Sequence, residues 1–113
     1  MERKFKLKNE ELKFKLTNGD MLSIDEKYGN ASNVVNSLVF GEKGFLTNSL
    51  RVISEACKTR ELTVEELTDN LTSTQLMQEV PSLAINIYFD YMGIKTGEEE
   101  KTEEELKKDT KKK

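Results

Sequence analysis

The chain has 113 residues, which is the size of one domain. It holds 18 Lys and Arg against 21 Asp and Glu, so its net charge is −3. Histidine is absent and Cys57 is the single cysteine, which excludes from this sequence Ser-His-Asp and Cys-His catalytic sites, His-based metal sites and an intramolecular disulfide. We therefore expect a binding protein that needs no cofactor or metal, and not an enzyme.

The charge is unevenly distributed along the chain. Residues 1–16 have six basic and three acidic side chains, residues 17–94 have five and eleven, and residues 95–113 have seven of each. The last segment has one large apolar residue, Leu106, and cannot bury enough surface to offset its ordering entropy. We predict one folded domain over residues 1–94 and a charged, flexible and largely disordered tail over residues 95–113.

The N-terminal residues alternate between apolar and basic side chains, as in strands with one buried face. Asn18-Gly19 then provides a strong hairpin signal, because a type I′ turn needs positive φ at both central residues. Leu22 and Ile24 follow at alternate positions. The pattern predicts an N-terminal β-hairpin or short meander of two or three strands. The alternating residues are Phe5, Leu7, Leu12, Phe14 and Leu16 on one face and Lys4, Lys6, Lys8, Lys13 and Lys15 on the other.

After Ile24 the apolar spacing becomes helical. Ser23-Ile-Asp-Glu26 fits a capping box for a short helix that Gly29 ends. Asn30 or Ser32 can cap the next helix, which is expected to end at Gly41. A third helix has four residues at steps of four, three and four, which places them on one face. These residues are Leu46, Leu50, Ile53 and Cys57.

Two further helical segments complete the predicted bundle. Thr63-Val-Glu-Glu66 is a capping box that opens a short helix. Pro81 interrupts the last apolar run, so we expect a kink there or a new helix with Pro81 in its first turn, ending at Gly93. The predicted fold class is α+β and mostly helical, with the hairpin or meander followed by a small helical bundle and the charged tail. The last apolar run consists of Leu76, Val80, Leu83, Ile87 and Tyr91.

Two groups of residues could form a catalytic or metal site, but a purely structural role is the favoured interpretation for both. Glu65 and Glu66, with Asp69, could bind a hard cation, but glutamates are also favoured in the first turn of a solvated helix. Cys57 is expected to be a small buried side chain on the inner face of its helix. Neither supports a catalytic or metal site.

The lysine side chains of the predicted strands provide one candidate binding surface. Five lysines on one face could contact phosphates, which makes a small nucleic-acid-associated regulator the alternative function. Phe5 and Phe14 lie on the other face, so no aromatic side chains are available there for base stacking. Lysine on a short exposed strand also prevents edge-to-edge aggregation. Nucleic acid is therefore the less favoured partner.

The last helical run provides the other candidate surface, for a protein partner. Its apolar side chains cover more than one face, and a small domain can bury only one stripe. The alternative, a central core helix, remains open. The candidate partner-binding residues are Met77, Val80, Leu83, Ile87, Tyr88 and Tyr91.

The order of these segments resembles the tail assembly chaperones of long-tailed phages and of prophages of Gram-positive bacteria. The similarity covers roughly residues 10–93 and consists of hydrophobic patterns. The segments that carry it are LTNGDMLSIDEKYGN, VVNSLVFG, FLTNSLRVISEACK, LTVEEL and LAINIYFDYMG, in that order.

The resemblance implies a binding role without catalytic residues. The expected partners are the tape measure protein, which such a chaperone coats, and the tail tube protein, which displaces it; self-association is compatible with this role. The expected location is the host cytoplasm, with no membrane association. Members of the family are often also made in a longer, frameshifted form, and Lys111-Lys112-Lys113 is compatible with a slippery codon run.

Overall fold

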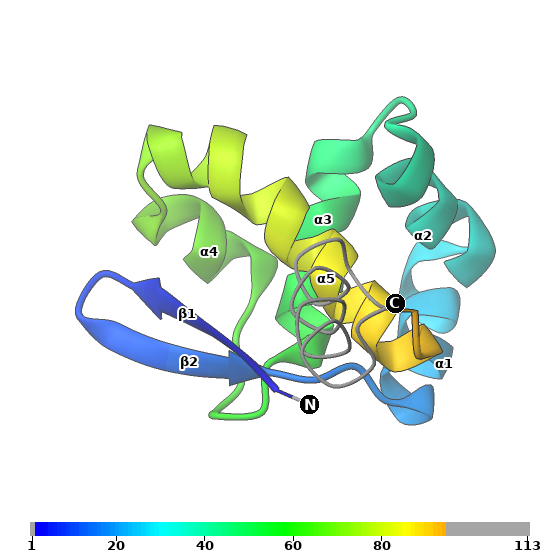
Figure 1. The fold of residues 1–113 in the computed structure, drawn as a ribbon, viewed down its shortest axis with the longest axis horizontal. Helices are drawn as coiled ribbons and strands as arrows, with labels where there is room; N and C mark the ends of the chain where they lie inside the picture. The colour runs from blue at the N-terminus through cyan, green and yellow to red at the C-terminus, as the bar shows by residue number, and fades with distance from the viewer. Residues whose placement is uncertain (1, 95–113) are drawn as a thin grey trace, which may run out of the picture.

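The N-terminal hairpin is present in the computed structural model, which describes residues 2–94. Strands β1 (Arg3–Leu7) and β2 (Glu10–Phe14) pair in antiparallel register (Figure 1). A two-residue turn at Lys8-Asn9 joins them, and Lys8 has a φ of 56°. Helices follow, so the predicted α+β, mostly helical fold is confirmed. The predicted tail at residues 95–113 lies outside the described residues.

The predicted turn at Asn18-Gly19 is wrong, because these residues begin helix α1 (Asn18–Tyr28). The hydroxyl of Thr17 accepts from the amide of Asp20 at 3.1 Å, and the Asp20 carboxylate accepts from the amide of Thr17 at 3.0 Å. This reciprocal capping box stabilises the helix start by about 1 kcal/mol. The hairpin therefore has two strands and turns ten residues earlier than expected.

The apolar residues of α1 explain why residues 22–24 form a helix and not a third strand. Met21, Ile24 and Tyr28 have helical spacing and pack in or against the core, whereas Leu22 is 71% exposed. The alternation of Leu22 and Ile24 was therefore misleading. The capping box predicted at Ser23 is also wrong, since that residue lies inside α1. The helix does end at Tyr28, before Gly29, as predicted.

Helices α2 (Ala31–Phe40) and α3 (Phe45–Ala56) form an antiparallel pair joined by a short turn (Figure 1). Asn30 caps α2, because its side-chain oxygen accepts from two backbone amides at the helix start. Gly41 and Gly44 flank the turn with φ of 63° and 81°, a left-handed conformation that favours glycine. The predicted cap and helix end are confirmed.

The chain continues through α4 (Val64–Asn70), one π-helical turn η1 (Gln75–Glu79) and helix α5 (Val80–Met92). Thr63 caps α4 by accepting from the amide of Glu66 at 3.0 Å, which is one half of the predicted capping box; the Glu66 carboxylate binds Arg60. Pro81 lies in the first turn of α5, where its missing amide hydrogen leaves no helical bond unmade. Pro81 thus lies in the first turn of α5, as one of the two alternatives expected, but α5 continues the helical backbone of the π turn and is not a separate new helix; Gly93 ends it.

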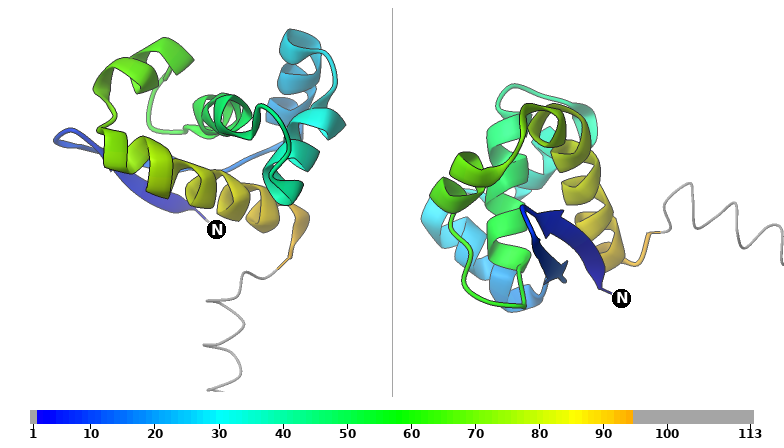
Figure 2. Two further views of the ribbon diagram at one scale, coloured as in Figure 1. Left: turned by 90° about the horizontal axis from the view of Figure 1, so that it is seen from above. Right: turned by 90° about the vertical axis from the view of Figure 1, so that its left-hand side faces the viewer.

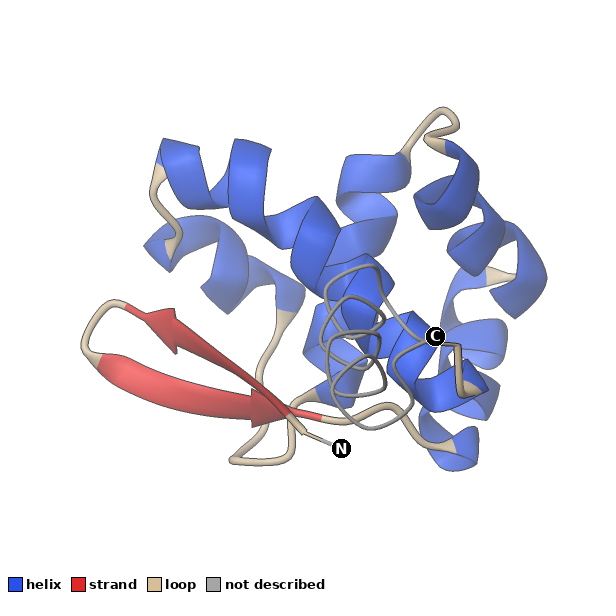
Figure 3. Cartoon of the chain, viewed as in Figure 1, coloured by secondary structure: helices blue, strands red, loops and turns tan. Residues whose placement is uncertain are grey.

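The core lies between α5, α3 and the inner face of the hairpin (Figure 2). Outside the hairpin, the described elements are helical, apart from a bridge between Phe14 and Cys57 (Figure 3). There the backbone amide of Lys15 donates to the carbonyl of Ala56 at 2.9 Å, and the backbone amide of Lys58 donates to the carbonyl of Lys13 at 2.8 Å. The edge of β2 that does not pair with β1 is thus hydrogen-bonded to residues 56 and 58. The most deeply buried large side chains are Phe14, Leu12, Ile24, Ile53, Leu67, Ile87, Val52 and Val80.

Two arginines fasten the hairpin to the helices. The guanidinium of Arg3 donates to both carboxylate oxygens of Asp90, in the last turn of α5, at 2.6 and 2.9 Å. At the turn end, Arg60 binds Glu10 of β2 and Glu66 of α4, with contacts of 2.9 and 2.5 Å. The Arg60 guanidinium holds the pKa of both carboxyl groups below their usual value. Ion pairs at both ends of the hairpin thereby connect it to α5 and α4, which are distant from it in the sequence.

Candidate functional site

Helix α5 does not present its predicted partner-binding residues as one surface. Val80 and Ile87 are 0% and 1% exposed, and Leu83 is 9% exposed, so these three lie in the core. Tyr88 and Tyr91 are half-buried against the core, while Met77, in η1, is 63% exposed. The structure therefore places most of this helix in the position of a central core helix.

The two tyrosines of this set have structural contacts. The hydroxyl of Tyr91 donates to the side-chain oxygen of Asn18 at 2.5 Å, which joins the end of α5 to the start of α1. The rings of Tyr88 and Tyr91 lie 6.5 Å apart between centroids. Tyr91 is thus positioned by the fold and contributes to the packing between two helices.

A different apolar surface lies at the turn between α2 and α3. We define the α2–α3 tip as Val39, Phe40 and Phe45, which are 37%, 69% and 37% exposed. Val39 and Phe40 end α2 and Phe45 begins α3, so all three flank the same turn. Sequence reasoning missed this surface, because neither Phe40 nor Phe45 differs in type from the apolar residues of the same helices that are buried.

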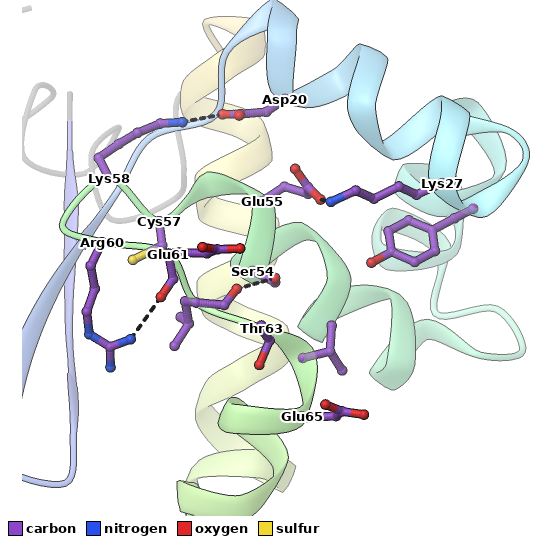
Figure 4. A pocket seen from close by; sticks show the side chains of 13 residues that line it. Asp20, Lys27, Ser54, Glu55, Cys57, Lys58, Arg60, Glu61, Thr63 and Glu65 are labelled. Carbon is purple, nitrogen blue, oxygen red and sulfur yellow. Dashed lines mark hydrogen bonds and ion pairs between the residues drawn. The ribbon is translucent and has the colours of Figure 1, made fainter.

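A cavity of about 590 Å³, lined mainly by polar and charged side chains, lies between α1, the end of α3 and the loop that leads into α4 (Figure 4). Lys27 donates to Glu55 at 2.6 Å, which raises the pKa of Lys27 above its usual value. Lys58 donates to Asp20 at 2.6 Å. These ion pairs neutralise both lysines and hold α1 against α3 and the following loop. The charged side chains of these two ion pairs therefore have a structural role.

Cys57 lines this cavity and is half-buried. The prediction that it lies on the inner face of a helix is wrong, because α3 ends at Ala56 and Cys57 has extended backbone. The helix ends there because residues 56–58 pair with β2. Ala56, at 0% exposed, takes the inner position instead.

The acidic residues of α4 have a structural explanation. Glu66 binds Arg60, and its amide donates to the capping hydroxyl of Thr63. Glu65 and Asp69 are exposed. Within residues 2–94, no group of three or more Cys, Asp or Glu side chains is placed to hold a metal ion.

The outer face of the hairpin is a strip of basic side chains. We define the lysine face as Lys4, Lys6, Lys13 and Lys15, all of them exposed. Lys4 stands directly opposite Lys13, and Lys6 opposite Glu11. Lys4 also lies 4.0 Å from Glu11, at the limit of an ion pair. The predicted alternation of the strands is thus confirmed, except that Lys8 lies in the turn, and it leaves positive charge concentrated on one face.

The chain has no match among models of protein families, curated proteins or solved structures. Among the described helices, none combines the length and the apolar character needed to cross a bilayer.

Proposed function

We propose that the protein is a tail assembly chaperone of a long-tailed phage or prophage. In this role it binds the tape measure protein in the host cytoplasm, assists polymerisation of the tail tube and is displaced by the tail tube protein. Two features support this role: the order of sequence segments over residues 10–93 and the apolar side chains of the α2–α3 tip.

The α2–α3 tip is the observation on which the role depends most. Burial of one large apolar side chain by a partner contributes about 1.5–3 kcal/mol. Phe40 is 69% exposed and Phe45 is 37% exposed, so a partner helix with an apolar stripe has aromatic side chains to cover. Many copies along one long partner make weak single contacts sufficient.

Binding to the tape measure protein encoded by the same genome tests this role. The double variant Phe40→Ser and Phe45→Ser removes aromatic side chains without opening the core, so it should remain folded by circular dichroism. We expect it to bind more than about tenfold more weakly, because the apolar area buried by the partner is lost. Titration calorimetry or co-purification at moderate salt measures this.

Leu22→Ser is the matched control, because Leu22 is also strongly exposed, at 71%, but lies on α1. It should bind like the unchanged protein. If the tape measure protein does not bind, the role is refuted. If both variants bind it as tightly as the unchanged protein, the α2–α3 tip is not the contact.

The lysine face favours the alternative function, a small nucleic-acid-associated regulator. Four phosphate contacts with a single strand predict that affinity falls about 50-fold between 50 and 200 mM salt. Burial of the apolar α2–α3 tip, in contrast, depends little on salt. A salt titration with an oligonucleotide and with the tape measure protein therefore separates the two functions.

A further inference from the structure

The two edges of the hairpin differ in their backbone hydrogen bonds. On β2, the amide of Lys13 donates to the hydroxyl of Thr59 at 2.9 Å, and the carbonyl of Lys13 accepts from the amide of Lys58 at 2.8 Å. Both backbone groups of Lys13 therefore point away from β1. The β2 edge of the hairpin is thus occupied by a later part of the same chain.

The register of the strands gives the orientation of the corresponding groups on β1. Lys4 stands opposite Lys13, and in an antiparallel ladder the pairs that exchange hydrogen bonds alternate with pairs that do not. The amide and carbonyl of Lys4 must therefore point to the outer edge of β1, and those of Lys6 must do the same. A hydrogen bond confirms this direction, because the side-chain amide of Gln75 donates to the carbonyl of Lys6 at 2.9 Å.

The outer edge of β1 is otherwise open. Within residues 2–94, no hydrogen bond reaches the amide or the carbonyl of Lys4, or the amide of Lys6. The described sheet has two strands, so no strand lies beside this edge (Figure 3). A hollow of about 270 Å³ at β1 is lined, among the described residues, by the hairpin alone, namely by Lys4, Phe5, Lys6 and Glu11. Three backbone groups are thus available to an added strand.

The side chains beside this edge determine which kind of strand it fits. Lys4 and Lys6 are exposed on the outer face, and Lys13 adds a positive charge opposite Lys4. A second copy of β1 at this edge would place lysines against lysines, which is unfavourable. Carboxylates at alternate positions of an added strand would instead stand opposite Lys4 and Lys6, since side chains of one strand alternate between the two faces.

We propose that the outer edge of β1 binds an extended acidic peptide of another protein, which adds to the hairpin as a third strand. The peptide backbone accepts from the amides of Lys4 and Lys6 and donates to the carbonyl of Lys4, while its acidic side chains pair with the two lysines. A phosphate backbone has no donor for that carbonyl, which favours a peptide over nucleic acid. The site does not include the α2–α3 tip and is independent of the partner bound there.

Amide hydrogen exchange tests the added strand directly. The probe is a synthetic hexapeptide of alternating glutamate and valine with blocked ends. At saturation it should slow the exchange of the amides of Lys4 and Lys6 by at least about tenfold, because both become hydrogen-bonded. The amide of Phe5, which points to β2, is the internal control and should change much less. No protection of Lys4 and Lys6 at saturation would overturn the proposal.

Control probes separate strand addition from attraction between charges alone. A hexapeptide of the same sequence with methylated backbone nitrogens keeps its carboxylates but cannot donate to the carbonyl of Lys4, so it should bind at least about tenfold more weakly. Equal affinities of the two peptides would overturn the proposal. Tighter binding of an oligothymidine of equal charge would assign the edge to nucleic acid and would overturn it as well.

A matched pair of variants at Lys4 tests the same bond from the protein side. Lys4→Ala and Lys4→Pro both lose the charge, but only Lys4→Pro also loses the outward amide. That amide makes no bond within the hairpin, so both variants should remain folded by circular dichroism. We expect Lys4→Ala to bind the glutamate–valine peptide about threefold more weakly than the unchanged protein, and Lys4→Pro about tenfold more weakly than Lys4→Ala. Equal binding by the two folded variants would contradict strand addition.

The position of the charges provides the last test. The double change Lys4→Glu and Lys6→Glu places carboxylates at the open edge and should weaken peptide binding by more than about tenfold. The double change Lys13→Glu and Lys15→Glu alters the net charge equally but lies on β2, one strand further from the peptide, and should weaken it by less than about threefold. Equal losses would show that the peptide binds the lysine face as a whole and not the edge of β1.

Discussion

The two faces of the hairpin use charge in opposite ways. On the inner face, Arg3 and Glu10 stand at the two ends of the hairpin. Arg3 binds Asp90 of α5, and Glu10 binds Arg60 in the loop between α3 and α4. The side chains of Arg3 and Asp90 are only 19% and 11% exposed. On the outer face the lysines are exposed, and two of them stand opposite each other.

This difference teaches where charge contributes to stability and where it contributes to recognition. A partly buried bidentate pair fixes one orientation of two groups and is little screened by water. Exposed lysines are strongly hydrated and contribute little to the free energy of folding. The inner charges therefore position the hairpin on the helices, while the outer charges remain available to a ligand.

The largest effect is expected for Phe14→Ala on the inner face. Phe14 is fully buried, so its removal leaves a cavity and should lower the free energy of unfolding by about 3–5 kcal/mol. Urea denaturation followed by circular dichroism measures the loss. Lys13→Ala, at the next position on the outer face, is the control and should change stability by less than about 0.5 kcal/mol. Similar losses for both variants would contradict the division between the faces.

A double-mutant cycle at Arg3 and Asp90 should give the next largest effect. The coupling free energy between Arg3→Ala and Asp90→Ala is expected to be about 1–3 kcal/mol, because both hydrogen bonds involve charged and partly buried groups. Denaturant midpoints of the two single variants and the double variant measure it. The same cycle at Lys4 and Glu11 should give a coupling near zero. If the coupling at Arg3 and Asp90 is no larger than the coupling at Lys4 and Glu11, the Arg3–Asp90 pair does not stabilise the packing of β1 against α5.

At the turn where the two faces meet, Lys8→Gly should be stabilising. Lys8 has a φ of 56°, which strains a residue with a side chain, and glycine adopts it readily. We expect a gain of about 0.5–1 kcal/mol in the free energy of unfolding, measured by urea denaturation. Asn9→Gly, at a position without positive φ, should not be stabilising. A loss of stability in Lys8→Gly would mean that this turn does not form in solution.

The smallest effect is expected at Arg60, and it depends on pH. In the folded protein the pKa of Glu10 and of Glu66 is lowered by Arg60, so the stabilisation is complete above their ordinary value of 4.5 and decreases as the pH falls below it. Arg60→Gln should therefore lose stability at neutral pH and little at pH 3. Urea midpoints at the two pH values measure this. An equal loss at both values would assign the effect of Arg60 to packing.

The position of the hairpin turn shows how far local sequence predicted the fold. Alternation at Phe5, Leu7 and Leu12 correctly predicted two strands and their inner face, because burial of one face imposes a period of two. The Asn-Gly signal was misleading because the reciprocal bonds between Thr17 and Asp20 favour a helix start at the same place. A turn that begins with lysine at positive φ has no local signal, so tertiary packing of both strands must determine it.

The candidate surfaces were less predictable than the fold. The spacing of Val80, Leu83 and Ile87 is equally compatible with a core stripe and with a binding stripe, since both require apolar residues on one face. Only the packing of α5 against α3 shows that they are buried. Phe40 and Phe45, in contrast, are exposed at the turn between α2 and α3, and only the structure shows this.

The contact between Arg3 and Asp90 joins residues 87 positions apart in the chain. During synthesis on the ribosome, the strands emerge before the helices, and α5, which completes their burial, is the last of the described elements to emerge. The inner face of the hairpin therefore becomes fully buried only after α5 has been made, and side chains such as Phe14 are incompletely covered until then. The closing of this long loop, and not the formation of the individual helices, should limit the rate at which the newly made chain becomes native.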